Sequence, residues 1–430
     1  MPRVLADLTP LRVHRNFRRL WLGQLVSGFG SQLTIVGVSY QAYRLSHSTL
    51  IVGLVSLAQL GPLLIGSLIG GSIVDAKDRR KVLLVTQVVL ASASLGLAVN
   101  ATFPHPRLWP LFVLTSAGAA VQGLDWPARK AVVPMLVPPE DLPAALALQQ
   151  ILQQFGMVAG PAVAGLLIAS VGLGAVYGID VATFGAAMLA VLLLPRLVPT
   201  GGGRQAGLAS IREGLHYLRG QRLLASTFWI DIDAMVFGMP RAVFPALGTG
   251  LFGGGAATVG LLYAAPAAGA FIGSLLTGWV SSVRRQGRAI VIAIVVWGAA
   301  ISAFGLIPVL WVGLILLALA GAADVVSAVF RNAVLQTTVP EQLQGRMSGV
   351  FISVVSGGPR LGDAEAGAAA AIGGAQFAVW SGGLACIAGA LLLARRIPEL
   401  WGYDSAAGLG TGSVEASTTA AAELSESEPI

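Results

Sequence analysis

Cysteine and histidine are scarce in this chain, and their positions exclude several kinds of site. Among 430 residues there are one cysteine, Cys386, and four histidines. One cysteine forms no disulfide within the chain, and a thiolate metal site needs several ligands. The histidines, His14, His47, His105 and His216, fall in expected termini and loops. We therefore expect no metal site and no histidine relay in the interior.

The chain also lacks a sequence for binding nucleotide phosphates. It has no GxxxxGK[ST] loop, so nothing indicates ATP-driven work within this chain, and we expect no cofactor. A convergent set of catalytic side chains is missing too, outside one charged segment near residue 360. We therefore predict that the protein is not an enzyme and that an ion gradient supplies its energy.

Charge is scarce along the whole length. Charged residues make up 11% of the chain and hydrophobic residues 55%, whereas a soluble domain carries about a quarter charged residues. Apolar runs long enough to cross a bilayer recur throughout. We place them near residues 17–43, 50–74, 82–103, 108–128, 143–170, 175–195, 223–247, 256–281, 289–307, 309–330, 346–372 and 375–394. The sequence thus predicts an all-α polytopic membrane protein with twelve spans.

The positive charges record how these spans are oriented. The chain holds 27 Lys and Arg residues and a formal charge of +7. Most of them cluster at alternate ends of successive runs, including a group at Arg331, and the positive-inside rule places such clusters in the cytoplasm. We predict a bacterial plasma-membrane protein with both termini cytoplasmic. Membrane lipids, and no nucleic acid, are the expected macromolecular surroundings.

The runs divide into two sets of six, which indicates a duplication. The segment KAVVPMLVPPEDL at 130–142 matches RNAVLQTTVPEQL at 331–343 with a constant offset, as parallel repeats facing a central cavity would. We predict an N-terminal six-helix bundle at 1–200 and a C-terminal six-helix bundle at 223–400. Between them, 201–222 predicts a cytosolic linker with an amphipathic helix, and 401–430 predicts a disordered cytosolic tail.

The segment between the second and third runs has the most specific motif. It reads GSIVDAKDRRK from Gly71 to Lys81, and it resembles the loop signature of the major facilitator superfamily. Asp75 would end one helix near the positive end of a helix in the other half, and the cations Arg79 and Arg80 would stay at the anionic leaflet. Breaking that contact would open an inner gate. A merely basic cytosolic turn is the alternative.

The fifth run carries a glycine and proline pattern, GxxxGPxxxG, with Gly156, Gly160, Pro161 and Gly165. It resembles the pattern that marks exporters within the same superfamily. Small residues at this spacing permit close helix packing, and the proline removes one helix hydrogen bond. Generic helix packing is the alternative to an exporter motif. Gln150 stands where the superfamily has a preceding glycine.

Further short segments resemble the enterobactin-exporter branch and its drug-efflux relatives. They are FRRL at 17–20, LSHSTLIVG at 45–53 and QTTVPEQLQGR at 336–346. The resemblance implies two pseudo-symmetric six-helix bundles, alternating access and proton-driven efflux of a siderophore or drug-like compound by a monomer. Two features depart from it: the first run has no acid, and we expect the fourth run to lack a buried arginine.

Charges inside apolar runs are functional candidates because each costs about 2.5–3.5 kcal/mol at the bilayer centre on insertion scales. In the seventh run Asp231 and Asp233 point about 200° apart on a helix. We expect Asp233 to face the cavity, with Arg241 two turns beyond. Asp324 and Asp180 are secondary candidates, for which helix capping or interhelical bonding is an equal alternative.

The eleventh run is the leading candidate for the substrate or proton site. Its glycines and Pro359 are expected to interrupt the helix and expose backbone groups to a water-filled cavity. Arg360 and Asp363 are spaced to pair, which would leave Glu365 free to titrate. A charge pair that only holds the bundle together is the alternative.

These features together favour a secondary transporter that exports a small molecule by alternating access, with protons moving inward. An importer or lipid flippase on the same scaffold is an alternative. A membrane-embedded enzyme built on Arg360, Asp363 and Glu365, or a sensor that transports nothing, is a further one.

Overall fold

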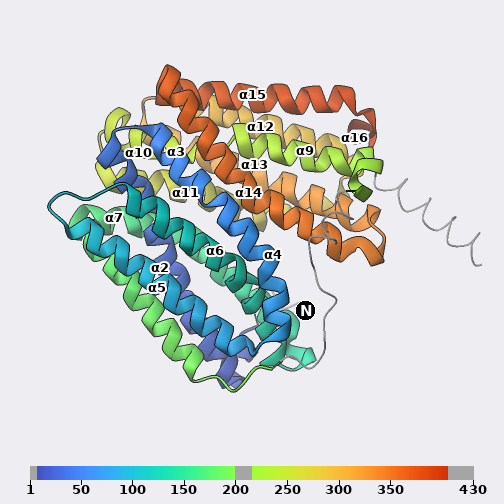
Figure 1. Cartoon of the computed structure of the whole chain (residues 1–430). Coiled ribbons are helices and arrows are strands. Elements are labelled where there is room, and N and C mark those ends of the chain that lie inside the picture. Colours follow the sequence, from blue (N-terminus) through green and yellow to red (C-terminus); the bar gives the residue numbers. More distant parts are fainter. Residues whose placement is uncertain (1–6, 199–215, 405–430) are drawn as a thin grey trace, which may run out of the picture.

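The computed structural model describes residues 7–198 and 216–404, and every regular element in those ranges is a helix. Most of the expected linker, up to residue 215, and the expected tail from residue 405 lie outside the described residues. The described helices form an N-terminal and a C-terminal bundle, drawn in blue to green and in yellow to red (Figure 1). The expected all-helical, two-bundle architecture is confirmed.

The N-terminal bundle contains the elements up to residue 192. In chain order they are α1 (Thr9–Val13), α2 (Arg15–Ser46), α3 (Thr49–Ala58), α4 (Leu60–Ala76), α5 (Arg79–Thr102), α6 (Trp109–Val132), η1 (Val133–Met135), η2 (Pro139–Asp141) and α7 (Leu142–Leu192). Together α3 and α4 make one span, with a break at Gln59. Helix α7 makes two spans, because Gly172 has a non-helical φ of 83° that reverses the chain.

The C-terminal bundle begins with α9 (Arg222–Phe237). It continues through η3 (Arg241–Val243), α10 (Phe244–Ala246), η4 (Leu247–Leu251), α11 (Gly255–Leu275), η5 (Thr277–Ser282), α12 (Gln286–Leu306), α13 (Leu310–Thr338), α14 (Glu341–Gly373), α15 (Ala375–Arg396) and α16 (Pro398–Gly402).

The twelve expected spans correspond to these helices. In the described ranges, eight helical segments are long and apolar enough to cross a membrane, one of which holds both arms of α7. Helices α2, α6 and α14 complete the set, since they are 32, 24 and 33 residues long but carry several charges. Large apolar side chains such as Leu95, Leu275 and Ile315 are more than half exposed on the outside, where lipid replaces water as the solvent.

The two bundles touch through small residues along two helix pairs. Between α3 and α14, a Cβ added at Gly367 would lie 2.6 Å from the Thr49 carbonyl oxygen, and Thr49 Oγ1 donates to the Gly367 carbonyl at 3.2 Å. Between α7 and α11, a Cβ added at Gly165 would lie 2.6 Å from the Ala256 carbonyl oxygen. Only glycine permits so close an approach, which is the usual means of helix association in lipid.

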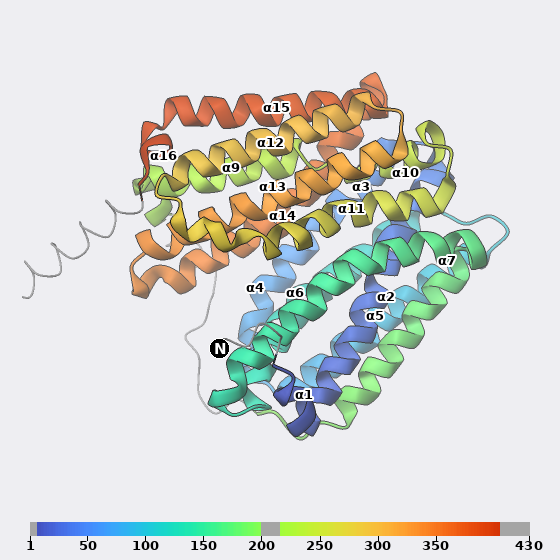
Figure 2. The same cartoon turned by 180° about the vertical axis from the view of Figure 1, so that it is seen from behind.

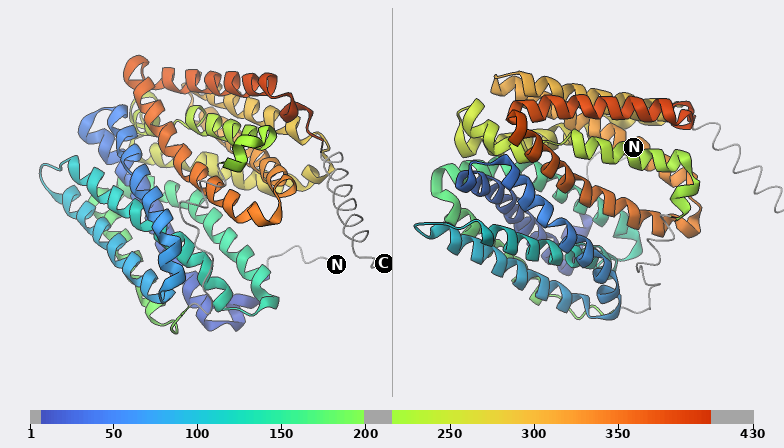
Figure 3. Two further views of the ribbon diagram at one scale, coloured as in Figure 1. Left: turned by 45° about the vertical axis from the view of Figure 1, so that its right-hand side comes forward. Right: turned by 45° about the horizontal axis from the view of Figure 1, so that its top comes forward.

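Both pairs lie at one end of the molecule, and the bundles diverge from there. Figure 2 shows α3, α10, α11 and the turn of α7 together at this end, with α1 and α16 at the other ends of the bundles. The two views of Figure 3 agree with this arrangement. We call the end at α3, α10 and α11 the joined end.

We predict that Gly165→Val weakens the joined end. The added side chain would overlap the α11 backbone, and overpacking of this kind costs about 1–3 kcal/mol. Spin labels at Arg44 and Ile372, with Cys386 replaced by serine, should report a wider separation of α2 from the end of α14. Gly156→Val is the matched control on the same helix, because a Cβ there meets nothing within 4 Å. Equal distance distributions in the two variants would contradict the prediction.

Candidate functional site

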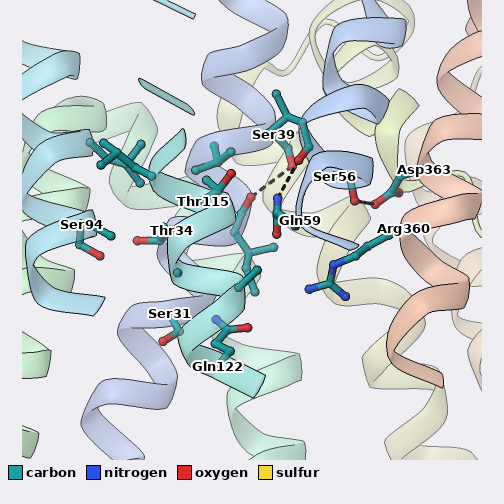
Figure 4. A pocket seen from close by; sticks show the side chains of 18 of the residues that line it. Ser31, Thr34, Ser39, Ser56, Gln59, Ser94, Thr115, Gln122, Arg360 and Asp363 are labelled. Atoms are coloured by element: carbon teal, nitrogen blue, oxygen red, sulfur yellow. Dashed lines mark hydrogen bonds between the residues drawn. The ribbon is translucent and has the colours of Figure 1, made fainter. Parts of the chain in front are cut away.

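A cavity of about 200 Å³ lies between the bundles beside the joined end. The N-terminal bundle lines it with apolar side chains, with hydroxyl and amide side chains, several of which are labelled in Figure 4, and with Asp180. The C-terminal bundle contributes charges from η3 and α14. The polar lining residues labelled in the figure are Ser31, Thr34, Ser39, Ser56, Gln59, Ser94, Thr115, Gln122, Arg360 and Asp363.

The charged wall of the cavity consists of Arg241, Arg360 and Asp363. Arg360 Nη1 donates to the Ser356 carbonyl at 2.6 Å, and its Nε is buried without a partner among the described residues. Arg241 Nη2 lies 3.1 Å from the Met239 sulfur. A sulfur is a weak acceptor, so both guanidinium groups keep donors for a ligand in the cavity.

Asp363 joins the two bundles across this cavity. Ser56 Oγ of α3 donates to Asp363 Oδ2 at 2.6 Å, whereas Oδ1 is buried and unpartnered in the described part of the chain. The expected pairing of Asp363 with Arg360 is not the one formed, because each side chain has the partner given above. Asp363 therefore connects the cavity to the α3–α14 contact.

The expected interruption of the eleventh span is wrong, since α14 is continuous from Glu341 to Gly373 with Pro359 inside it. Its glycines serve packing. A Cβ at Gly358 would lie 2.6 Å from the Met235 sulfur of α9, and Gly362 faces the Met235 carbonyl closely. Pro359 removes one backbone hydrogen bond, but the helix continues through it in close contact with α9.

Three of the expected substrate or proton residues, Asp233, Asp324 and Glu365, do not line the cavity. Asp233, which we expected to face it, points at Gly389 of α15, where a side chain would overlap its carboxylate. Glu365 is half-buried on α14 but is not among the lining residues. The sequence predicted correctly that Asp233 and Glu365 lie on two membrane-spanning helices. Packing of the helices against α15 and α3 determines which face of each helix turns toward the cavity, and the sequence did not show this.

Arg331 corrects the assignment of the basic clusters. We placed it with the cytoplasmic charges because the apolar run was expected to end at residue 330. Helix α13 continues to Thr338, so Arg331 lies inside the bundle with 5% of its side chain exposed. It forms an ion pair with Asp231 of α9, and its Nη2 lies 3.8 Å from Asp324 Oδ1. Asp324 thus belongs to this buried group.

The fourth span carries a pair that the sequence reading missed. Asp125 is 4% exposed and forms an ion pair with Arg129 one turn along α6, and Thr86 Oγ1 of α5 donates to it at 2.7 Å. Arg129 lies in the last turn of α6 with 20% of its side chain exposed, so the expected lack of a buried arginine in this span stays a prediction. The i, i+4 spacing of an acid and an arginine was the available signal.

The loop signature packs on its own bundle. Arg80 Nη2 donates to the Leu192 carbonyl at 2.6 Å, and Arg79 Nη1 donates to the Ala131 carbonyl at 3.0 Å. Among the side chains that the structure describes, the cation nearest to Asp75 is Arg79, at 4.0 Å. No contact of Asp75 with the C-terminal bundle is found among those side chains, and the bundles diverge at that end. The contact stays a prediction for a state in which that end is closed.

The exporter-type pattern lies at the bundle interface. Gly165 and the Pro161 carbonyl approach Gly260 of α11, and Gly160 faces the side chain of Gln32 in α2. Gly156 has open space around it. Three of the four positions therefore serve close packing, partly within the N-terminal bundle and partly between the bundles.

No group of three or more His, Cys, Asp or Glu side chains that could hold a metal ion occurs in the ranges that the structure describes. The arrangement is a polar and charged cavity between two helical bundles, with buried ion pairs in each bundle. A polar cavity where two helical bundles meet is the arrangement typical of secondary transporters.

Comparison with known proteins gives the family. The model of the family described as transmembrane secretion effector matches residues 5–411, and the chain belongs to this family of major facilitator transporters. It is 31% identical over 363 residues to the enterobactin exporter EntS of Shigella boydii serotype 4 (strain Sb227), covering 84% of this chain and 87% of that protein. The Escherichia coli O1:K1 / APEC exporter EntS gives the same values.

Solved structures share the fold at low sequence identity. A nucleoside transporter NupG (D323A mutant) is 14% identical with a TM-score of 0.74, over 90% of this chain and 100% of that chain. A D-xylose-proton symporter is 16% identical with a TM-score of 0.69, over 90% and 98%. The expected superfamily and its exporter branch are confirmed, and the relatives with this fold are transporters.

We predict that removing Arg331 destabilises the protein strongly. Arg331→Gln would leave Asp231 and Asp324 without their cation, and breaking a buried pair costs about 3–5 kcal/mol. The thermal unfolding midpoint in detergent should fall, and the added change Asp231→Asn should restore part of the loss. Arg395→Gln, at an exposed residue of α15, is the control. A midpoint that falls no further in Arg331→Gln than in this control would refute the prediction.

Proposed function

We propose that this protein is a proton-coupled antiporter that exports a siderophore-like or amphipathic small molecule across the plasma membrane by alternating access. The observation that carries the proposal is the cavity, which both bundles line and which has Arg241, Arg360 and Asp363 on one wall and hydroxyl groups on the other. Identity with the enterobactin exporters supports export of a compound of that class.

The cavity chemistry supports an oxygen-rich or anionic substrate. Two guanidinium groups with free donors bind carboxylate or phenolate oxygens more strongly than neutral donors do. The facing serine, threonine and glutamine side chains both donate and accept. The apolar part of the lining, such as Leu90, Leu97 and Phe184, would hold the aromatic or aliphatic part of an amphipathic molecule.

The arrangement of the bundles supports an inward-open state. The positive-inside rule assigns the end with α1 and α16 to the cytoplasm, and the joined end would then face outward. Both termini would be cytoplasmic, as the charge pattern predicts. In the opposite state the loop at Asp75, Arg79 and Arg80 would meet the C-terminal bundle, and the α3–α14 contact with its Ser56–Asp363 hydrogen bond would part.

The remaining acids are assigned by their surroundings. Asp363 would couple substrate binding to the outer contact, since it lies in both. Glu365 and Asp233 are further proton candidates, and Asp324 would act with Arg331.

Import or lipid movement on the same scaffold would use the same cavity in the reverse direction. An enzyme would need Arg360, Asp363 and Glu365 to converge on one point, and Glu365 does not line the cavity.

The test is transport in reconstituted vesicles with an imposed proton gradient, using enterobactin and a cationic dye as probes. We expect gradient-driven movement of enterobactin, reduced about tenfold or more in Arg241→Gln and in Arg360→Gln, because a hydrogen bond to a charged group contributes about 1.5–3 kcal/mol. Arg395→Gln should transport as the wild type does.

The outcomes separate the parts of the proposal. Faster movement of the dye than of enterobactin would replace the anionic substrate class with a cationic one. Gradient-driven uptake into the compartment that corresponds to the cytoplasm would establish import. Equal flux with and without the gradient would remove proton coupling, and loss of coupling in Asp363→Asn or Glu365→Gln would place the proton on α14.

A further inference from the structure

Asp180 is a buried acid of the N-terminal bundle that has no counter-ion among the residues that the structure describes. It lies on the second arm of α7, is 1% exposed and lines the cavity. No other charged residue occurs in α2 between Leu20 and Tyr43, in α5 after Lys81, or in α7 after Gly172. The other buried acids differ, since Asp125 has Arg129 and Asp231 has Arg331.

The titratable and charged groups that face Asp180 come from few elements. Tyr177 is one turn away on the same helix, and α2 and α5 contribute none at this level. Across the cavity are Tyr263 of α11, Arg241 of η3, and Arg360 and Asp363 of α14.

Neutral hydroxyl groups hold the Asp180 carboxyl instead of a cation. Thr34 Oγ1 of α2 donates to Oδ2 at 2.6 Å, and Ser94 Oγ of α5 donates to the same oxygen at 2.7 Å. Thr183 Oγ1 lies 3.3 Å from Oδ1. Gly30 makes room for this group, because a Cβ there would overlap both Asp180 and Thr183. Hydroxyls can both donate and accept, so the cradle fits the ionised and the protonated carboxyl.

A stripe of polar side chains, partly exposed at Ser31 and Thr34 and buried at Ser27 and Gln24, leads away from Asp180 along α2. Gln24, Ser27, Ser31 and Thr34 are three or four residues apart, so they share one helix face. Gln24 Nε2 and Ser27 Oγ are buried without a partner among the described residues. An unpaired buried polar group costs about 1–3 kcal/mol, a cost that a bound water would offset.

A small cavity on this stripe has the size and lining for such a water. Its volume is about 10 Å³, and Gln24 of α2, Gln87 of α5 and Arg129 of α6 line it. One water molecule needs roughly 10–15 Å³. Gln87 Oε1 is also buried and unpartnered in the described part of the chain. A water here would accept from Gln24 and donate to Gln87, next to the Asp125–Arg129 pair.

We propose that Asp180 carries the exchanged proton, and that waters along Gln24, Ser27 and Ser31 connect it to the Asp125–Arg129 end of the N-terminal bundle. The protonated carboxyl gives its proton to a water, the proton leaves as hydronium along the stripe, and the carboxylate that remains is held by Thr34, Ser94 and Thr183. The proton route then shares the cavity wall at Asp180, Thr34 and Ser31, and leaves the substrate cavity where the stripe continues to Ser27 and Gln24. The inference rests on the proposed antiport.

Infrared difference spectroscopy across a pH step tests the proton site without any substrate. We expect the wild type to show the carbonyl stretch of a protonated buried carboxyl that Asp180→Asn lacks and Asp125→Asn keeps. Gly30→Ala, which displaces the Asp180 carboxyl, should shift the frequency of that band. This variant replaces Asp180→Asn in the test if Asp180→Asn does not fold. Superimposable spectra of the wild type and Asp180→Asn, with no shift in Gly30→Ala, would overturn the proposal.

Transport then tests the role in coupling. In vesicles, the ratio of gradient-driven enterobactin flux to enterobactin counterflow should fall at least about tenfold in Asp180→Asn, since a positioned proton carrier contributes about two or more powers of ten to a proton-transfer step. An unchanged ratio would overturn the role. If the wild type moves no enterobactin while the infrared band behaves as expected, the proposed substrate fails and the proton site stands.

Cysteine labelling tests the water route. Cys386 is the one cysteine of the chain, so Cys386→Ser gives a thiol-free background. A small water-borne methanethiosulfonate should label Ser27→Cys at least about tenfold faster than Leu33→Cys, because only a hydrated thiol ionises and reacts. Leu33 lies on the same helix, is 0% exposed in an apolar cluster and lines neither cavity. Equal rates would contradict a hydrated stripe.

Discussion

Close backbone contact between the two bundles is the interaction on which the rest of the structure depends. It is made where glycines on α3, α7, α11 and α14 remove the side chains that would keep the helices apart. In lipid there is no hydrophobic force between helices, so van der Waals packing of this kind has to supply the association. The cavity lies beside these contacts, and its charged wall is held by the same α14 helix.

Several acids inside the two bundles fall into two groups, those that have a cation as partner and those that have a hydroxyl group. Asp125 with Arg129, and Asp231 and Asp324 with Arg331, have cations within their own bundle. Asp363 has a serine from the other bundle, and Asp180 has only hydroxyls. Ion pairs resist change because separating them exposes both charges to a low dielectric. Asp180 has hydroxyl partners and no ion pair among the described residues, so a change in its protonation separates no pair of charges.

Much of the fold followed from the sequence. Run length, the grouping into two sets of six and the 130–142 and 331–343 match predicted the two bundles. The site was predicted less completely. Arg241, Arg360 and Asp363 do line the cavity, but Asp233 and Glu365 do not. Arg331 was misplaced because a helix can extend beyond its apolar run, and Asp125 was missed because its neighbour Arg129 read as part of a cytoplasmic cluster.

The sequence by itself determined that this protein lies in a lipid bilayer, how many times it crosses the bilayer and to which superfamily it belongs. Each of these follows from residue type and spacing along one chain. Only the tertiary structure decided which face of each helix turns inward, and hence which carboxylates meet a cation, a hydroxyl or the cavity. The physical reason is that helix rotation depends on packing against other helices. In the cases of Asp180 beside Gly30 and Asp363 beside Ser56, the partners are distant in sequence and no local pattern predicts the contact.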